Sequence, residues 1–399
     1  MAGLRSDRPR LLVRLADRTP GRIAESRKAV PRSRFVLPAI LLGFAAVSTG
    51  APPLDRAKSE AVDRILDAWM KKSGIPGLSA AIALDGEVVW SRGLGIADVE
   101  NSVAAKPETV YRSASIGKPI TATAAMRLVE LGKLDLDLSV ERYCPAFPRK
   151  KWAVTSRHLL THTSGIRHYG GPRDREEQTS TVHYEDVADA LAPFRDDPLL
   201  FEPGTKYSYS TYGFDVLGCA MQGAAGRAFM DVIRSLVFEP AGMKRSRDDD
   251  PFAVIPNRAA GYVREKGELK NAPHVDMSNR LPAGGYATTA PDLTNFAASF
   301  IDCKLVSCEM RDAMLTPQTL KNGEAIDYGF GWGLATGENW YGETEAFHGG
   351  SSPGASGMIY LLPRRRFAVV FLTNLESAPE RMETAAAIAK VVLDLGTKK

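Results

Sequence analysis

A serine and a lysine stand three positions apart, Ser115 and Lys118, at the start of the apolar stretch YRSASIGKPITATAAMRLVELG (111–132). Its alanines and leucines recur every three or four residues until Gly132, which predicts a helix that ends there. Residues three apart share one face of a helix, so the Ser115 hydroxyl and the Lys118 amine are expected to meet.

This pair of side chains can perform nucleophilic chemistry. A serine hydroxyl is a weak nucleophile at neutral pH, and a lysine whose pKa is lowered by burial or by nearby cations can act as its base. The start of the same helix supplies backbone N–H groups for a developing oxyanion. An isolated S-x-x-K is more often a helix cap followed by a solvated lysine, so the motif needs further support.

A second chemical segment is EPGTKYSYSTYGFDVLG (202–218), in which Tyr209, Ser210 and Thr211 lie between a Pro-Gly turn and a predicted helix. A tyrosine that points into a site with nearby cations loses its proton more readily and can act as a general acid or base. Taken alone, such a tyrosine is more often a core or rim aromatic residue.

A third segment is Phe347-His348-Gly349-Gly350, just before a predicted strand. Glycines there let a backbone approach a ligand, and the histidine could donate a hydrogen bond or pass a proton.

The order S-x-x-K, then Y-x-(N/S/T), then (K/H)-x-G resembles the penicillin-recognising serine hydrolases, which include class C β-lactamases, D,D-peptidases and related esterases. The similarity covers about residues 75–395. GKLDLD (132–137) and HTSGIRHY (162–169) are most similar to the LACTB-type branch, whose animal members are mitochondrial. Further supporting segments are LLTHTSGI (159–166), EPGTKYSYS (202–210), FEPAGM (238–243), PAGGYATTAPDL (282–293) and YGFGWG (328–333).

The resemblance implies a role for each matching residue. Ser115 would attack the substrate, Lys118 would take its proton, and Tyr209 would relay a proton to the leaving group. His348 would stand where many members have a lysine. The oxyanion hole would consist of the backbone N–H groups of Ser115 and Ser351.

The resemblance also implies that Thr211, Gly349 and Gly350 bind substrate, and two departures affect what that substrate is. Thr211 replaces an asparagine, and H-G-G replaces K-T-G, so the expected activity is that of a peptidase or esterase with at most slow penicillin turnover. The alternatives are a class C β-lactamase or D,D-carboxypeptidase proper, and a non-catalytic binding or assembly module on the same fold. The expected partner is a small-molecule or peptide substrate, and no cofactor or metal is required.

The order of the helices and strands that the sequence predicts indicates an α+β fold. An antiparallel sheet is expected to be flanked by helices from both ends of the chain, with a mostly helical subdomain at about 135–262 inside a hydrolase domain of 51–399. The predicted helices are 55–72 and 380–395. The predicted strands are 78–84, 88–95, 358–362 and 367–373, joined in pairs at Asp85-Gly86 and at 363–366.

Residues 1–50 form a basic leader and an apolar segment. The first 34 residues contain ten Lys or Arg and three acids, so the net charge of +4 lies entirely in this tail, and nothing predicts nucleic-acid binding. The apolar run 35–47 has the length of a signal-peptide core, which predicts export, to a periplasm for example, or membrane attachment through this run. An arginine-rich leader of this kind is also typical of mitochondrial targeting, the alternative location.

The four cysteines are too few for a disulfide scaffold. Cys303 and Cys308 are near enough to pair in an oxidising compartment, and the alternative is that all four are unpaired. Oligomeric state is left open.

Two further patterns in the sequence could indicate other sites. Residues 350–354 match G-x-S-x-G with Ser352 as nucleophile, but the next residue, Pro353, has no N–H for an oxyanion. The histidines His158, His162 and His168 have no acid at ligand spacing and are interpreted as structural.

Overall fold

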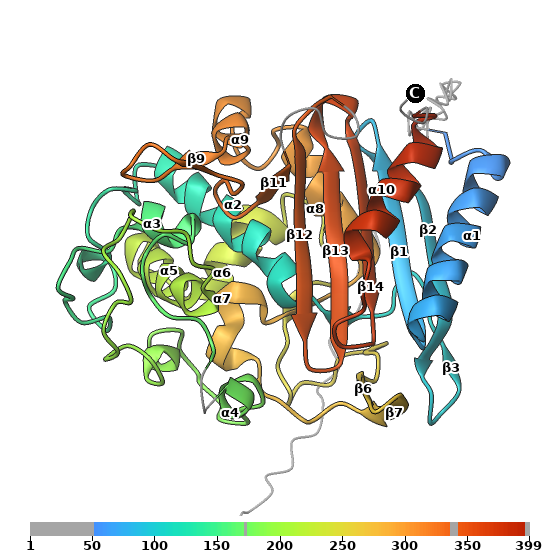
Figure 1. The fold of residues 1–399 in the computed structure, drawn as a ribbon, viewed down its shortest axis with the longest axis horizontal. Coiled ribbons are helices and arrows are strands. Elements are labelled where there is room, and N and C mark those ends of the chain that lie inside the picture. The colour runs from blue at the N-terminus through green and yellow to red at the C-terminus, as the bar shows by residue number, and fades with distance from the viewer. Residues whose placement is uncertain (1–51, 171–173, 336–341, 396–399) are drawn as a thin grey trace, which may run out of the picture. The chain divides into compact units, whose positions relative to one another are not determined.

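The computed structural model describes residues 52–170, 174–335 and 342–395, and its main feature is a seven-stranded antiparallel sheet (Figure 1). The strand order is β11-β12-β13-β14-β1-β2-β3. These strands are β1 Gly77–Leu84, β2 Glu87–Asp98, β3 Val103–Ala104, β11 Gly333–Ala335, β12 Glu345–Ser352, β13 Ala355–Leu362 and β14 Phe367–Thr373. The smaller sheets contain β4 Tyr111–Arg112, β5 Arg247–Asp248, β6 Tyr262–Glu265, β7 Glu268–Asn271, β8 Tyr286–Thr288, β9 Gln318–Thr319 and β10 Ala325–Ile326.

The α-helices of the described residues are α1 Arg56–Ser73, α2 Gly117–Glu130, α3 Ser156–Leu160, α4 Asp174–Gln178, α5 Thr211–Ala225, α6 Phe229–Ile233, α7 Leu281–Gly284, α8 Ala290–Ile301, α9 Cys308–Met314 and α10 Arg381–Val392. Five of them, α2 to α6, follow one another along the chain between β4 and β5. Two 3₁₀ turns matter for the site, namely η1 Ala114–Ile116 and η6 Ser278–Arg280.

The predicted terminal helices and hairpins are confirmed. Asp55 caps α1 by accepting a hydrogen bond from the Lys58 N–H, and Gly74 ends the helix in the left-handed conformation. Asp85 and Gly86, with φ of 53° and 87°, form the tight turn between β1 and β2, because asparagine, aspartate and glycine best tolerate positive φ.

The sheet lies between two layers, which confirms the α+β fold class. Helices α1 and α10 pack together over one face, and α8 packs against the other (Figure 1). Every residue of β13 and β14 is buried, as expected for strands covered on both faces.

A helical layer lies beside the sheet on the side of β11 and β12 (Figure 1). Within it α5 packs against α2, α3, α6 and α7. Strand β11 pairs with β12 only as far as Phe347, so the later residues of β12 form an open edge that contacts η1. This edge and the start of α2 come together where the sequence places its chemical residues.

All four cysteines are paired, so the alternative of four unpaired cysteines is wrong. Cys303 and Cys308 form a short loop, whereas Cys144 and Cys219 connect positions 75 residues apart with Cα atoms 5.4 Å from each other. The long-range pair was missed because sequence spacing contains no information about which distant segments become neighbours.

The predicted leader, residues 1–50 with the apolar run 35–47, lies outside the described residues. Among the residues that are described, none of the helices is both long and apolar enough to cross a bilayer.

Candidate active site

The turn that leads into α2 holds Ser115 in a constrained geometry. Ala114 has φ of 47°, a left-handed conformation that is unfavourable for a residue with a Cβ atom. Ser113 donates a hydrogen bond to the carbonyl of Gly284 at 3.1 Å. A Cβ atom on Gly284 would lie 1.9 Å from the Ala114 oxygen, so only glycine fits against this turn. The backbone before Ser115 is therefore held in place by its contacts with Gly284.

Lys118 lies completely buried one turn further along, and its Nζ is 3.1 Å from Ser115 Oγ. Its other two neighbours are the carbonyl oxygen of Ala283 at 3.1 Å and Thr211 Oγ1 at 3.4 Å. A neutral amine has two N–H donors and one lone pair. These three neighbours match that set, because Ala283 and Thr211 accept the N–H groups and the lone pair is left for the Ser115 proton.

The surroundings of Lys118 favour the neutral amine. Burial lowers the pKa of Lys118 to about 7, while Asp215 opposes the shift and Arg280 adds to it. Burial also raises the pKa of Asp215 well above its ordinary value, although Lys118 and Arg280 lower it in part. Lys118 and Asp215 are thus both pushed toward their uncharged forms.

Tyr209 comes to the same place from the start of α5. Ser210 caps that helix by accepting a hydrogen bond from the Gly213 N–H at 2.9 Å, which leaves Tyr209 just outside the helix. Lys118 Nζ lies 4.8 Å from the centre of the Tyr209 ring. Burial raises the pKa of Tyr209 above its ordinary value, and the Ser115 hydroxyl lowers it in part. The expectation that nearby cations ease its proton loss is therefore wrong, because desolvation is the larger effect.

The open edge of β12 forms the opposite wall of the site. A small cavity is lined by residues from both walls, including Ser115, Thr211, Arg280, Ser351 and Ser352. Ser351 thus lies where its backbone N–H can serve the predicted oxyanion role. That role stays a prediction.

The two glycines of β12 face opposite ways. A Cβ atom on Gly350 would lie 2.7 Å from the Ser113 oxygen, so this glycine lets β12 approach the turn that carries Ser115. A Cβ atom on Gly349 would instead approach Arg381 of α10 and Met358. The two positions differ because successive residues of a strand point to opposite faces. Neither Gly349 nor Gly350 lines the small cavity around Ser115.

His348 lies near Tyr209, with ring centres 6.2 Å apart, but both of its nitrogens are engaged elsewhere. Nδ1 donates to the Gly349 carbonyl at 2.7 Å, and Nε2 lies 3.0 Å from the Tyr328 hydroxyl. This geometry leaves neither nitrogen free for direct proton exchange with substrate.

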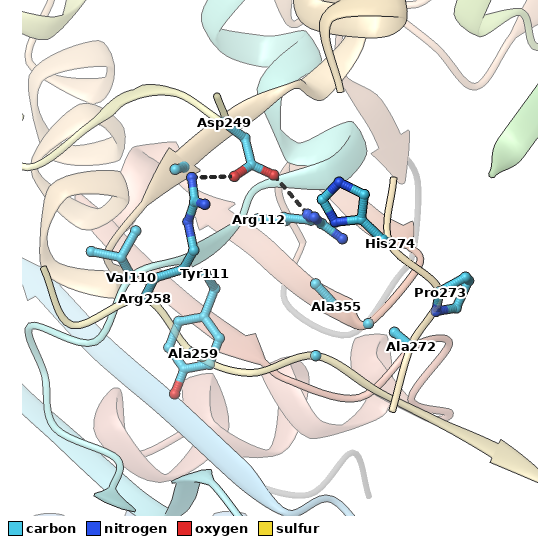
Figure 2. Close-up of a pocket in the computed structure, with 13 residues that line it drawn as sticks. Val110, Tyr111, Arg112, Asp249, Arg258, Ala259, Ala272, Pro273, His274 and Ala355 are labelled. Atoms are coloured by element: carbon cyan, nitrogen blue, oxygen red, sulfur yellow. Dashed lines mark hydrogen bonds and ion pairs between the residues drawn. The ribbon is translucent and has the colours of Figure 1, made fainter. Parts of the chain in front are cut away.

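A second cavity, of about 220 Å³, lies behind the turn that follows β12 (Figure 2). In it the buried Asp249 stands between the guanidinium groups of Arg112 and Arg258, at 2.6 and 3.0 Å. Arg112 also donates to the Pro353 carbonyl at 2.8 Å. This ion-pair cluster holds the turn beside Ser351 and Ser352.

The structure places Lys118 beside Ser115, Thr211 and Tyr209, while the roles of these residues stay predictions. Sequence reasoning missed Asp215 and Arg280. No motif marks them. A charged residue in the middle of the otherwise apolar helix sequence TYGFDVLGCAM was the one available signal for Asp215. The residues that the structure describes contain no group of three or more His, Cys, Asp or Glu side chains that could hold a metal ion.

Comparison with known proteins agrees with this geometry. The beta-lactamase family model matches residues 62–393. The serine beta-lactamase-like protein LACTB of Mus musculus, described as mitochondrial, is 30% identical over 79% of this chain and 75% of its own length. The esterase EstB of Burkholderia gladioli is 34% identical over 50% of this chain and 55% of its own. The octameric penicillin-binding protein homologue from Pyrococcus abyssi has a TM-score of 0.72 at 27% identity, with 84% of this chain and 77% of that chain covered.

The chain belongs to the beta-lactamase family of serine hydrolases. Within that family it resembles both LACTB proteins and penicillin-binding proteins.

Proposed function

We propose that this protein is a serine hydrolase that forms an acyl-enzyme at Ser115 and acts on small amide or ester substrates. The observation that carries the proposal is the 3.1 Å contact between Ser115 Oγ and the fully buried Lys118 Nζ. Burial lowers the pKa of that amine to about 7, so much of it is a free base at neutral pH.

The proposed reaction has two stages. Neutral Lys118 takes the Ser115 proton as the oxygen attacks the substrate carbonyl, and the backbone N–H groups of Ser115 and Ser351 stabilise the oxyanion. Tyr209, a neutral phenol in the free protein, gives a proton to the leaving group. Water then attacks the acyl-enzyme. Tyr209 takes the proton of this water, and Lys118 returns its proton to Ser115 Oγ as the acid product leaves.

Two contacts favour a peptidase or esterase over a β-lactamase or D,D-carboxypeptidase proper. Thr211 Oγ1 lies 3.4 Å from Lys118 Nζ, so it serves the base and has no amide to offer a substrate. His348 is bound to Tyr328 and to the Gly349 carbonyl, and burial lowers its pKa to about 3, so it brings no cation for a substrate carboxylate.

Labelling tests the function directly. A fluorophosphonate probe is expected to modify the purified protein at Ser115, as read by peptide mass spectrometry, and to leave Ser115→Ala unmodified. A panel of p-nitrophenyl esters, D-Ala-D-Ala peptides and nitrocefin then ranks the substrate classes, with the esters expected first. A folded protein that is neither labelled nor active on any of these would support the alternative of a binding module.

The pH dependence follows from the neutral base. Because only unprotonated Lys118 accepts the Ser115 proton, kcat/KM is expected to fall about tenfold per pH unit below an apparent pKa of about 7 and to level off above it. The pKa of His168 is lowered by burial to about 4, and that of His348 to about 3, so neither accounts for a limb near neutrality. A rate that is flat between pH 5 and 9 would contradict Lys118 as the base.

We propose export for the location. The two disulfides favour an oxidising compartment over a reducing one. An oxidising compartment also agrees with export directed by the signal-like run 35–47. Mitochondrial targeting stays the alternative.

A further inference from the structure

His162 contacts Tyr209 and both of its neighbours in the chain. Its carbonyl accepts the Ser208 N–H at 2.8 Å, and its Nδ1 accepts the Ser210 N–H at 3.1 Å. These two residues are the chain neighbours of Tyr209 on either side. The imidazole ring itself lies against the Tyr209 ring, with the centres 4.2 Å apart.

The backbone of His162 is itself unusual. Its φ is 57°, a left-handed conformation that is unfavourable for a residue with a Cβ atom. The side chain is only 1% exposed. Strain of this kind persists where the surrounding contacts determine the conformation, and it is concentrated at functional sites.

The backbone partners of His162 and His348 determine which nitrogen of each ring carries the hydrogen. A backbone N–H can only donate, so His162 Nδ1 accepts and its Nε2 carries the proton toward the Tyr328 oxygen at 3.2 Å. A carbonyl can only accept, so His348 Nδ1 donates to Gly349 and its Nε2 accepts from the Tyr328 hydroxyl at 3.0 Å. The two hydrogen bonds therefore run in the same direction, from His162 to Tyr328 and from Tyr328 to His348. Every nitrogen and hydroxyl of these three side chains then has a hydrogen-bond partner.

The chain His162–Tyr328–His348 therefore links the two walls of the site. It begins at the segment that carries Tyr209 and ends on β12, three residues before Ser351. The groups that act electrostatically on His162 are Lys118, His348 and His168. Together with burial they lower the pKa of His162 well below its ordinary value, so the ring stays neutral. The titratable phenols of Tyr207, Tyr209 and Tyr328 also face its ring.

We propose that His162 is a positioning residue, which, through its contacts with both neighbours of Tyr209 and its bond to Tyr328, holds the Tyr209 phenol in line with Ser115. It is not a catalytic base, because its lone pair is used by the Ser210 N–H. The proposal rests on the proposed function, since the reaction needs the Tyr209 proton at the leaving group.

Two substitutions separate the contacts. His162→Asn keeps an acceptor near the Nδ1 position and tolerates positive φ, but it loses the ring and the bond to Tyr328. Tyr328→Phe removes one hydroxyl, and with it both hydrogen bonds of the chain, while the rings stay. His158→Asn is the matched control, because His158 lies four residues earlier and its side chain accepts the Thr155 N–H at the start of α3.

The readout is kcat and KM for phenyl acetate and for p-nitrophenyl acetate, whose better leaving group needs less protonation. His162→Asn is expected to lower kcat for phenyl acetate by about 10- to 100-fold, to affect the nitrophenyl ester much less, and to leave KM nearly unchanged. Tyr328→Phe is expected to act in the same direction with a smaller effect, and it carries the test if His162→Asn does not fold. His158→Asn should behave as wild type.

A double-mutant cycle distinguishes positioning from general damage. In a Tyr209→Phe background His162→Asn is expected to cost little more, because it acts through the phenol that is already absent. Equal losses on both esters, or losses that multiply in the double variant, would overturn the proposal.

A second measurement is independent of activity. In ¹H–¹⁵N spectra of the imidazoles, His162 is expected to be the Nε2–H tautomer and to stay neutral from pH 5 to 9. A protonated Nδ1 or a titration in this range would overturn the positioning role. If instead wild type turns over neither ester while His162 gives the expected spectrum, the proposed function fails and the structural assignment of His162 stands.

Discussion

Replacing Lys118 with methionine is expected to lower kcat/KM for ester substrates by about 10²- to 10⁴-fold, the range that a positioned base contributes. Methionine has a similar length and no amine, so Ser115 loses the acceptor that lies 3.1 Å away. Since Lys118 is completely buried, an apolar side chain of similar volume should leave the melting temperature unchanged or raise it. Steady-state kinetics and a thermal melt on the same sample measure both effects.

The matched control for this variant is Lys133→Met. Lys133 follows the same helix but is exposed, so activity and stability should stay at the wild-type level. A Lys118→Met protein that folds and keeps more than about a tenth of wild-type activity would be incompatible with a general base worth 10²-fold or more. Another group would then have to take the Ser115 proton.

Removing the disulfide between Cys144 and Cys219 is expected to lower the free energy of unfolding by about 3–4 kcal/mol. The bond closes a loop across 75 residues and ties the chain before α3 to α5, the helix that begins at Thr211. Without it, the unfolded chain gains the freedom of that whole loop. Denaturant unfolding of a double Cys144→Ala, Cys219→Ala variant gives the number.

The second disulfide is a natural control. Cys303 and Cys308 close a loop across only 5 residues, so Cys303→Ala with Cys308→Ala should cost about 2 kcal/mol or less. If the two double variants lose the same stability, loop length does not explain the effect. Alkylation of protein taken directly from its native compartment should reveal no free thiol if both bonds form there.

Much of the fold could be predicted because it follows from local patterns. Asp55 and Gly74 mark the ends of the first helix by their capping chemistry, and Asp85-Gly86 marks a hairpin. The strands around residues 358–373 are continuous apolar runs because both faces of the sheet are covered. The stretch at 347–350 was expected to precede a strand, but it belongs to one, β12, because its two glycines obscure the alternating pattern.

The site could be predicted only in its nucleophile and its nearest partners. Ser115 and Lys118 are one helical turn apart, so their contact is a local property of the sequence. The burial of these side chains, by contrast, depends on segments far away in the sequence. The pKa of Tyr209 is raised because the folded chain surrounds its phenol, and no motif around Tyr209 indicates that.

The sequence by itself determined which side chains can react, where the helices and hairpins begin, and the family to which the chain belongs. The tertiary structure alone decided that Asp215 and Arg280 flank the base, that Cys144 meets Cys219, and that His162 contacts both sides of Tyr209. The physical reason is the distance along the chain over which each interaction acts. Capping, turns and helical spacing act over a few residues, whereas burial, disulfide pairing and hydrogen bonds between distant segments depend on how the whole chain packs.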